Sequence, residues 1–191
     1  MFIKTISKKC IFLCALSLFI LNKSYALEIG GALHKGTDAG TSAISLHALN
    51  EITKGSKFKW SVSYNRLNKI NVEWNNSELD FSTNTIDATI LYRQKLRSYS
   101  SFFNKVSIDY QAGISFNLTD NKFYWPDLDE EKYFSNKSDI NAVIALSANY
   151  ELDRTKSMYI GVKHLPSFSD FNSISTVYLG FSYKFGRKSN Y

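Results

Sequence analysis

Apolar and polar residues alternate with a period of two along most of the chain. In the segment 58–74 the even positions are mainly apolar or aromatic and most odd positions are polar, and the segments 86–92 and 106–116 repeat the pattern. Past residue 26 no stretch has convincing helical spacing. A period of two predicts β-strands that have one apolar and one polar face.

Eight such segments follow one another, and the connections between them alternate in length. The sequences TKGSK, KLRSYSSF and LDRTKS are shorter connections, whereas the segment 118–138 is long. Eight antiparallel strands are the smallest usual closed barrel, which its own side chains can fill, so a diffusion pore is not expected. The predicted strands are 27–36, 41–52, 57–75, 82–95, 104–118, 139–151, 157–165 and 174–185.

Two features decide which face of the barrel points outward. A soluble barrel of the lipocalin type would enclose its apolar face, whereas a membrane barrel presents that face to lipid and encloses polar groups. Aromatic residues gather near the strand ends, as interfacial girdles require, and the polar positions carry charges of both signs. We therefore predict an all-β fold, an eight-stranded antiparallel transmembrane β-barrel in the outer membrane. The aromatic residues are Trp60, Tyr64, Trp74, Tyr92, Tyr110, Tyr150, Tyr183 and Phe185, and the polar set is His34, His47, Lys59, Glu73, Asp87, Arg93, Lys105, Asp109, Asp139, Glu151 and Lys163.

The first 26 residues have the pattern of a secretory signal peptide. A basic start is followed by the apolar run 10–21 and by Ser24 and Ala26, which fit a cleavage site. We predict a signal peptide over 1–26 and a barrel domain over 27–191. The predicted signal contains four lysines and no acidic residue, so 23 Lys and Arg become 19 against 17 Asp and Glu. The barrel domain is then nearly neutral, which argues against nucleic-acid binding, and it lacks both cysteines.

Several segments in the second half of the chain resemble the lipid A 3-O-deacylases, the PagL-like acyloxyacyl hydrolases. The sequence GVKH at 161–164, the loop that reaches Asn172 and the ending GFSYKF at 180–185 follow the outline of that family, and DYQAGISF at 109–116 is similar to its central strand. The resemblance implies an eight-stranded outer-membrane barrel with an esterase site that contains a histidine. Pro166 occupies the position of the family's nucleophilic serine, and the strand 174–185 has no acidic residue.

The residue that corresponds to the family's catalytic histidine is His164. In the alternating pattern His164 has the same parity as Ile160 and Val162, that is, all three stand at even positions of one strand. This places His164 on the lipid-facing side at the outer end of its strand. If the chain is an enzyme, His164 is the general base, Ser167 or Ser169 is the nucleophile, and Asp170 is the orienting carboxylate. The alternative is a histidine that only ends the strand at the membrane interface.

Other side chains give weaker signals for a site. His34 and His47 fall on the inner face without a third metal ligand, and we predict a packed, hydrogen-bonded pair. The acidic residues between 127 and 131 lack the spacing of a calcium loop. We therefore predict no metal and no cofactor.

The sequence favours a non-enzymatic barrel with a packed polar lumen and a structural or surface-contact role. A lipid A esterase is the alternative, and a binding module that acts through the aromatic and acidic segment 121–134 is a third. The expected partners are outer-membrane lipid, lipopolysaccharide and, during biogenesis, the barrel assembly machinery, which would read a last strand that ends near Phe185. We expect a monomer.

Overall fold

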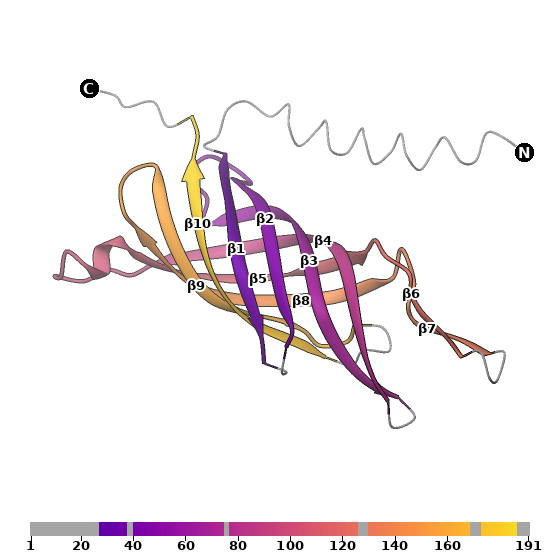
Figure 1. Ribbon diagram of the computed structural model, residues 1–191. Helices are drawn as coiled ribbons and strands as arrows, with labels where there is room; N and C mark the ends of the chain where they lie inside the picture. Colours follow the sequence, from indigo (N-terminus) through magenta and orange to yellow (C-terminus); the bar gives the residue numbers. More distant parts are fainter. Residues whose placement is uncertain (1–26, 38–39, 75–76, 126–129, 169–172, 187–191) are drawn as a thin grey trace, which may run out of the picture.

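The chain forms a closed barrel of eight antiparallel strands, with a separate two-stranded hairpin at one end (Figure 1). The structure is a computed structural model that describes residues 27–37, 40–74, 77–125, 130–168 and 173–186. The predicted signal peptide, Ser169, Asp170 and the side chains of Glu73 and Trp74 lie outside this description. No helix in the described residues is long and apolar enough to cross a membrane.

The strand order around the barrel is β1-β10-β9-β8-β5-β4-β3-β2, and β6 pairs with β7 alone. The predicted eight-stranded barrel is therefore confirmed, and most of the predicted strand ends fall within two residues of the observed ones. The elements are β1 (Glu28–Gly36), β2 (Ser42–Glu51), β3 (Phe58–Trp74), β4 (Ser77–Lys95), η1 (Phe103–Lys105), β5 (Val106–Asn117), β6 (Asn121–Trp125), β7 (Glu130–Ser135), β8 (Ile140–Glu151), β9 (Lys156–Leu165) and β10 (Ile174–Lys184).

The first and last strands close the barrel by pairing from Glu28↔Lys184 to Gly36↔Thr176. Full closure leaves no unpaired edge in the barrel itself, which is the condition for a sheet to lie in lipid. We call the end where β1 begins and β10 finishes the inner end. The opposite end, which carries the β6–β7 hairpin, is the outer end (Figure 1).

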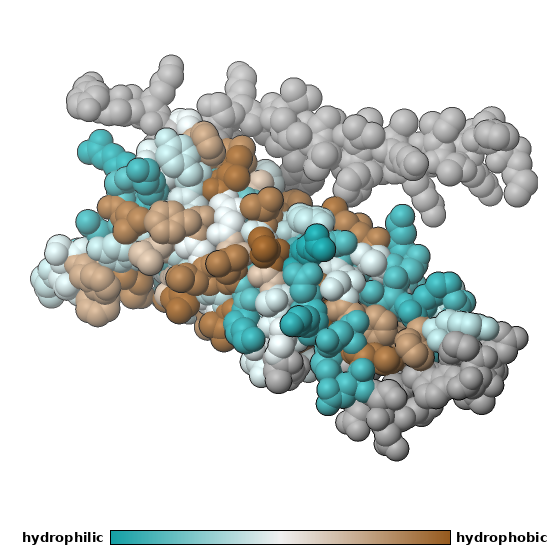
Figure 2. Space-filling view, viewed as in Figure 1, coloured by the Kyte–Doolittle hydropathy of each residue, from teal (hydrophilic) through white to brown (hydrophobic). Residues whose placement is uncertain are grey.

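The two faces of the barrel wall have opposite polarity. Leu33 is 68% exposed and Ile160 is 55% exposed on the outside, whereas Asp109, Asn65 and Thr85 are buried inside. In Figure 2 brown side chains form a band across the visible wall, with teal side chains towards its ends. A soluble protein would bury its apolar face, so this inverted polarity is the arrangement of a barrel whose wall faces lipid.

Aromatic side chains line the outside of the barrel at its inner end, as the sequence predicted. The rings of Phe58 and Tyr92 lie 5.2 Å apart, and those of Tyr183 and Phe185 lie 4.7 Å apart. Tyr110 continues this row beside Tyr92, at 6.3 Å. Aromatic rings prefer the boundary between hydrocarbon and headgroups, so this row marks one membrane interface.

The outer half of β3 departs from the predicted alternation. The pairing of β3 with β4 shifts register between Leu67 and Ile70, and Lys69 has a φ of 54° there. Such a bulge adds one residue and reverses the facing of the later residues in the strand. Ile70, which the sequence placed on the lipid side, is therefore buried inside the barrel.

Three further predictions were wrong, two about connections and one about the facing of Lys105. The connection expected between the predicted strands 57–75 and 82–95 is largely strand, since the pairing of β3 with β4 continues to Trp74↔Ser77. The expected loop at 118–138 contains the β6–β7 hairpin, because its aromatic and charged residues pair across a second small sheet. Lys105, expected in the lumen, ends η1 and is exposed to solvent.

Candidate functional site

Ion pairs cross the inner half of the lumen. Arg93 on β4 donates two hydrogen bonds to Asp109 on β5, at 2.8 and 2.7 Å, and a third to Glu28 on β1 at 3.2 Å. Asn149 donates to Asp109 at 2.8 Å, and Ser182 donates to Glu28 at 2.6 Å. Because β1 and β4 are separated by two strands, this network ties opposite parts of the wall together.

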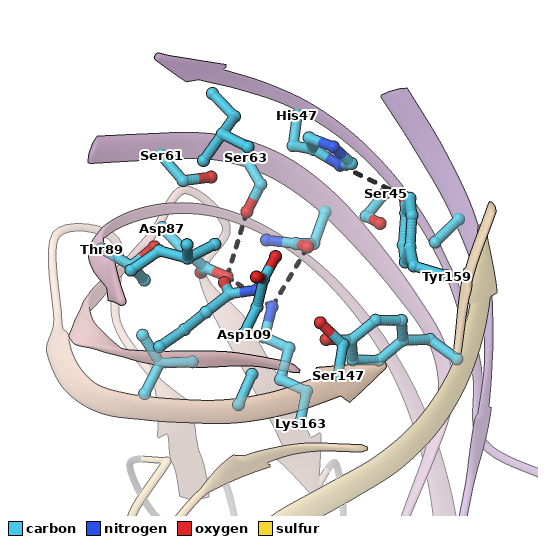
Figure 3. Close-up of a pocket in the computed structure, with 18 of the residues that line it drawn as sticks. Ser45, His47, Ser61, Ser63, Asp87, Thr89, Asp109, Ser147, Tyr159 and Lys163 are labelled. Carbon is cyan, nitrogen blue, oxygen red and sulfur yellow. Dashed lines mark hydrogen bonds and ion pairs between the residues drawn. The ribbon is translucent and has the colours of Figure 1, made fainter. Parts of the chain in front are cut away.

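A second ion pair lies nearer the middle of the lumen. Lys163 on β9 pairs with Asp87 on β4, and its amino group donates to Asn65 at 3.1 Å. Ser63 donates to Asp87 at 3.3 Å. Figure 3 shows Lys163 pointing across the lumen towards these groups. The mixed-sign interior that the sequence predicted is thus satisfied by pairing, as buried charges require.

The two lumen histidines have hydroxyl partners. His34 is hydrogen-bonded to Ser45 at 2.8 Å and to Thr176 at 3.2 Å, and His47 is hydrogen-bonded to Tyr159 at 3.3 Å. Within the described residues no three His, Cys, Asp or Glu side chains are placed to hold a metal ion. Both histidines therefore act in the described structure as packed, hydrogen-bonded groups.

Two tyrosines occupy space that glycines leave free. The rings of Tyr159 and Tyr178 lie 6.0 Å apart inside the barrel, next to Gly180 and Gly161. A Cβ atom at Gly180 would lie 2.2 Å from Cζ of Tyr159, and one at Gly161 would lie 2.7 Å from Cζ of Tyr178. The small residues in β9 and β10 are therefore needed to accommodate the rings.

A cavity of about 70 Å³ remains between these groups (Figure 3). Its lining includes Ser61, Asp87, Asp109, Ser147 and Tyr159. This volume has room for a few water molecules, which the hydroxyl and carboxylate groups of the lining can bind. It is too small for a ligand the size of a cofactor.

Apolar side chains close the outer end of the lumen. They form a cluster, here called the outer plug, that is centred on Phe168, which is 0% exposed and belongs to the β9–β10 connection. The sequence did not predict this cluster, because the bulge that turns Ile70 inward and the burial of a loop phenylalanine both depend on tertiary structure. The buried members are Ala43, Leu67, Ile70, Phe134, Val143, Leu165, Phe168 and Ile174.

His164 lies outside the barrel wall near the outer end, as its parity predicted. It is half-buried and pairs across the sheet with Ile144 and Ser175. Its Nδ1 atom is 2.7 Å from Oγ of Ser175, which shares the outward face of β10 with Val177. Ser167 is exposed in the following loop.

Ser175 was not predicted as a site residue. The sequence places it in the strand 174–185, with the same parity as Val177. Pairing that strand with the strand of His164 would have brought the two side chains to one face. Of the proposed catalytic residues, Ser169 and Asp170 lie outside the described residues.

The β6–β7 hairpin carries charged and aromatic side chains beyond the barrel wall. Lys122 pairs with Glu131, and the hydroxyl of Tyr133 donates to Glu131 at 3.2 Å. The hydrogen bond from Lys122 lowers the pKa of Glu131, and the same bond raises the pKa of Lys122. Tyr124 and Tyr133 are exposed, whereas Phe134 is buried in the outer plug. The hairpin is thus anchored by its apolar side and presents its polar side to solvent.

Comparisons with known proteins identify the fold. No protein-family model matches the chain, and no curated protein matches it. Among solved structures the chain is similar to Neisserial surface protein A, with 13% identity, coverage of 84% of this chain and 97% of that chain, and a TM-score of 0.54.

The chain is also similar to Ail, the attachment invasion locus protein of Yersinia pestis. For Ail in complex with the heparin analogue sucrose octasulfate, the identity is 14%, the coverage is 85% of this chain and 98% of that chain, and the TM-score is 0.50. For the outer membrane protein Ail in a phospholipid bilayer nanodisc, the identity is 11%, the coverage is 84% of this chain and 99% of that chain, and the TM-score is 0.51. At these identities the likeness establishes the fold, that of small eight-stranded outer-membrane barrels.

Proposed function

We propose that the chain is an integral protein of the bacterial outer membrane with a structural or surface-contact role. The observation that carries this proposal is the filled lumen inside an apolar wall. Ion pairs cross the interior at two levels, and the outer plug closes its outer end. A barrel of this kind provides a rigid support for surface contacts rather than a channel. We expect a monomer that is inserted by the barrel assembly machinery and surrounded by lipid and lipopolysaccharide.

The contact surface in this proposal is the β6–β7 hairpin. Tyr124 and Tyr133 are exposed on it, and the segment 118–138 contains five acidic and three basic residues. Exposed aromatic side chains beside charged groups are common in protein interfaces. The acidic balance favours a partner with positive groups, in contrast to Ail, whose solved complex contains a polyanionic heparin analogue.

The contact role is tested with the full protein refolded into nanodiscs of uncharged phosphatidylcholine. We expect fluorescent polylysine to bind the wild type. The variant Tyr124→Ser with Tyr133→Ser should weaken polylysine binding and leave the heat-modifiable migration of the folded barrel unchanged. The variant Phe58→Ser, at the inner end, is the matched control. Equal polylysine binding by wild type and hairpin variant would exclude the hairpin as the contact surface.

A second candidate function, a lipid A esterase, is favoured by one specific contact. The 2.7 Å approach of His164 Nδ1 to Ser175 Oγ gives a base and a hydroxyl on the outward face, where acyl chains of the outer leaflet would lie. We propose Ser175 as a nucleophile candidate beside Ser167 and Ser169, with His164 as the general base. Asp170 is the proposed orienting carboxylate.

Mass spectrometry of lipid A from cells with and without the protein tests this second function. The esterase predicts the loss of one acyl chain in cells that contain the wild type. His164→Ala should abolish that loss, and Ser175→Ala, Ser167→Ala and Ser169→Ala identify the nucleophile. Identical lipid A in both kinds of cell would refute the esterase and leave the contact role unaffected.

A further inference from the structure

The connection between β4 and β5 differs from the other connections at the inner end. Residues 96–105, here called the β4–β5 loop, include three aromatic residues, two basic residues and no acidic one. Tyr99 is 111% exposed, Phe102 is 55% exposed and Phe103 is 48% exposed. The neighbouring connections at 52–57 and 152–155 contain no aromatic residue.

The β4–β5 loop is held in a defined shape by its own hydrogen bonds. Leu96 donates to the carbonyl of Val106 at 3.0 Å and closes the base of the loop. Ser98 donates to the side chain of Asn104 at 3.0 Å, and Lys105 donates to the carbonyl of Phe102 at 3.0 Å. Three large apolar side chains are therefore presented to the surroundings by an organised backbone, although exposing them to water is unfavourable.

One aromatic contact joins the loop to the outside of the barrel wall. The ring of Phe102 stacks on Tyr150 at 5.1 Å and 29°, and Phe103 lies edge-on to Phe102 at 5.4 Å. Tyr150 has the parity of the exposed Ile144 and Leu146 on β8, so it belongs to the apolar wall. The aromatic surface of the wall thus continues onto the loop without interruption.

The charge of the loop favours one kind of surface. Arg97 and Lys105 are exposed, and neither is in a salt bridge within the described residues. Aromatic rings and basic side chains in one segment are the combination that binds the headgroup region of an anionic bilayer. A lipid partner also accounts for the continuity with the wall, which a soluble partner does not require.

We propose that the β4–β5 loop binds the headgroups of the inner leaflet, with Tyr99, Phe102 and Phe103 inserted at the interface and Arg97 and Lys105 on anionic phospholipid. This proposal rests on the proposed function as an integral outer-membrane protein. The loop extends from the inner end of the barrel (Figure 1). Its binding would fix the depth of the barrel in the membrane and couple that depth to the lipid charge of the leaflet.

The experiment uses a fluorophore whose emission shifts to the blue when it leaves water. The full chain with Cys10→Ser and Cys14→Ser receives one cysteine at Ser101, between the aromatic residues, and NBD is attached to it. The protein is reconstituted in vesicles of phosphatidylcholine with or without phosphatidylglycerol. NBD at Leu179 on the wall reports membrane insertion, and NBD at Lys54 in the connection 52–57 reports a position expected to stay in water.

We expect the label at Ser101 to be blue-shifted and protected from iodide, more strongly in the anionic vesicles. Arg97→Gln with Lys105→Gln should lower the ratio of bound to free loop in those vesicles about 25-fold, at roughly fivefold for each cation. Phe102→Ser with Phe103→Ser should expose the label in both lipids. A buried label at Leu179 with a water-exposed label at Ser101 would overturn the loop proposal while supporting the membrane location. An exposed label at Leu179 would refute the membrane location itself.

Discussion

Replacement of Asp109 by alanine should destabilise the barrel strongly. Asp109 is 2% exposed and accepts two hydrogen bonds from Arg93 and one from Asn149. Its removal leaves the Arg93 cation with Glu28 alone, at 3.2 Å. Two unit charges 4 Å apart interact by about 4 kcal/mol at an effective dielectric constant of 20. Removal of one partner of a buried pair costs about 3–5 kcal/mol.

Urea titration of the barrel in lipid vesicles measures this cost through tryptophan fluorescence, with heat-modifiable migration as an independent reading of the folded fraction. Lys95→Ala is the control, because Lys95 is 59% exposed and its pair with Glu151 should contribute less than about 1 kcal/mol. The double variant Asp109→Ala with Arg93→Met should recover part of the loss, since it removes the buried cation that lost Asp109 and leaves Glu28 with Lys59, at 3.9 Å, and Ser182. An Asp109→Ala barrel within about 1 kcal/mol of the wild type would refute the role of this ion pair.

Three further changes test other parts of the structure. Phe168→Ala removes the fully buried ring of the outer plug, and urea titration should show a loss of about 3–5 kcal/mol; an unchanged midpoint would mean that the plug does not stabilise the barrel. Gly180→Ala places a Cβ 2.2 Å from Cζ of Tyr159 and should lower the unfolding midpoint, with partial recovery when Tyr159→Leu is added. The hydrogen bond from Lys122 lowers the pKa of Glu131 below its ordinary value of 4.5. The stabilisation of the hairpin by this pair is therefore complete at pH values above 4.5 and is lost as the pH falls through the lowered pKa. The protection of the hairpin amides from exchange, measured against the intrinsic exchange rate at each pH, should therefore fall below pH 4.5, and a fall that begins well above this pH would contradict the assignment.

The barrel could be predicted from the sequence because a period of two fixes which residues share a face. Asp87, Asp109 and Lys163 were placed in the lumen on parity alone, and the structure places all three there in ion pairs. Parity does not report register across strands, so it could not show that Lys163 meets Asp87 on the far side of the barrel. It fails outright at Ile70, because a bulge changes the facing of a strand without changing the periodicity on either side.

The candidate sites were less predictable for a related reason. His164 was placed on the outward face correctly, but its hydroxyl partner Ser175 lies 11 positions away in the next strand. Proximity along the chain favours the hydroxyls of the adjacent loop instead. Phe168 gave no signal, because a phenylalanine among loop serines has the same local pattern whether it is buried or exposed. Contacts between chain segments decide both cases, and strand periodicity does not encode them.

The distribution of apolar residues in this barrel explains why its interior and its surface have separate roles. Outward-facing leucines and isoleucines are stable only against lipid, so they stabilise the barrel without contributing to contacts in water. The lumen is filled by ion pairs and, at its outer end, by the plug around Phe168. Side chains available for contact therefore concentrate at the two ends, where Tyr124 and Tyr133 are exposed on the outer hairpin and Tyr99 on the inner loop. Because the outer hairpin is net acidic and the inner loop is basic, the two ends favour different partners, and a variant at one end should leave the binding at the other intact.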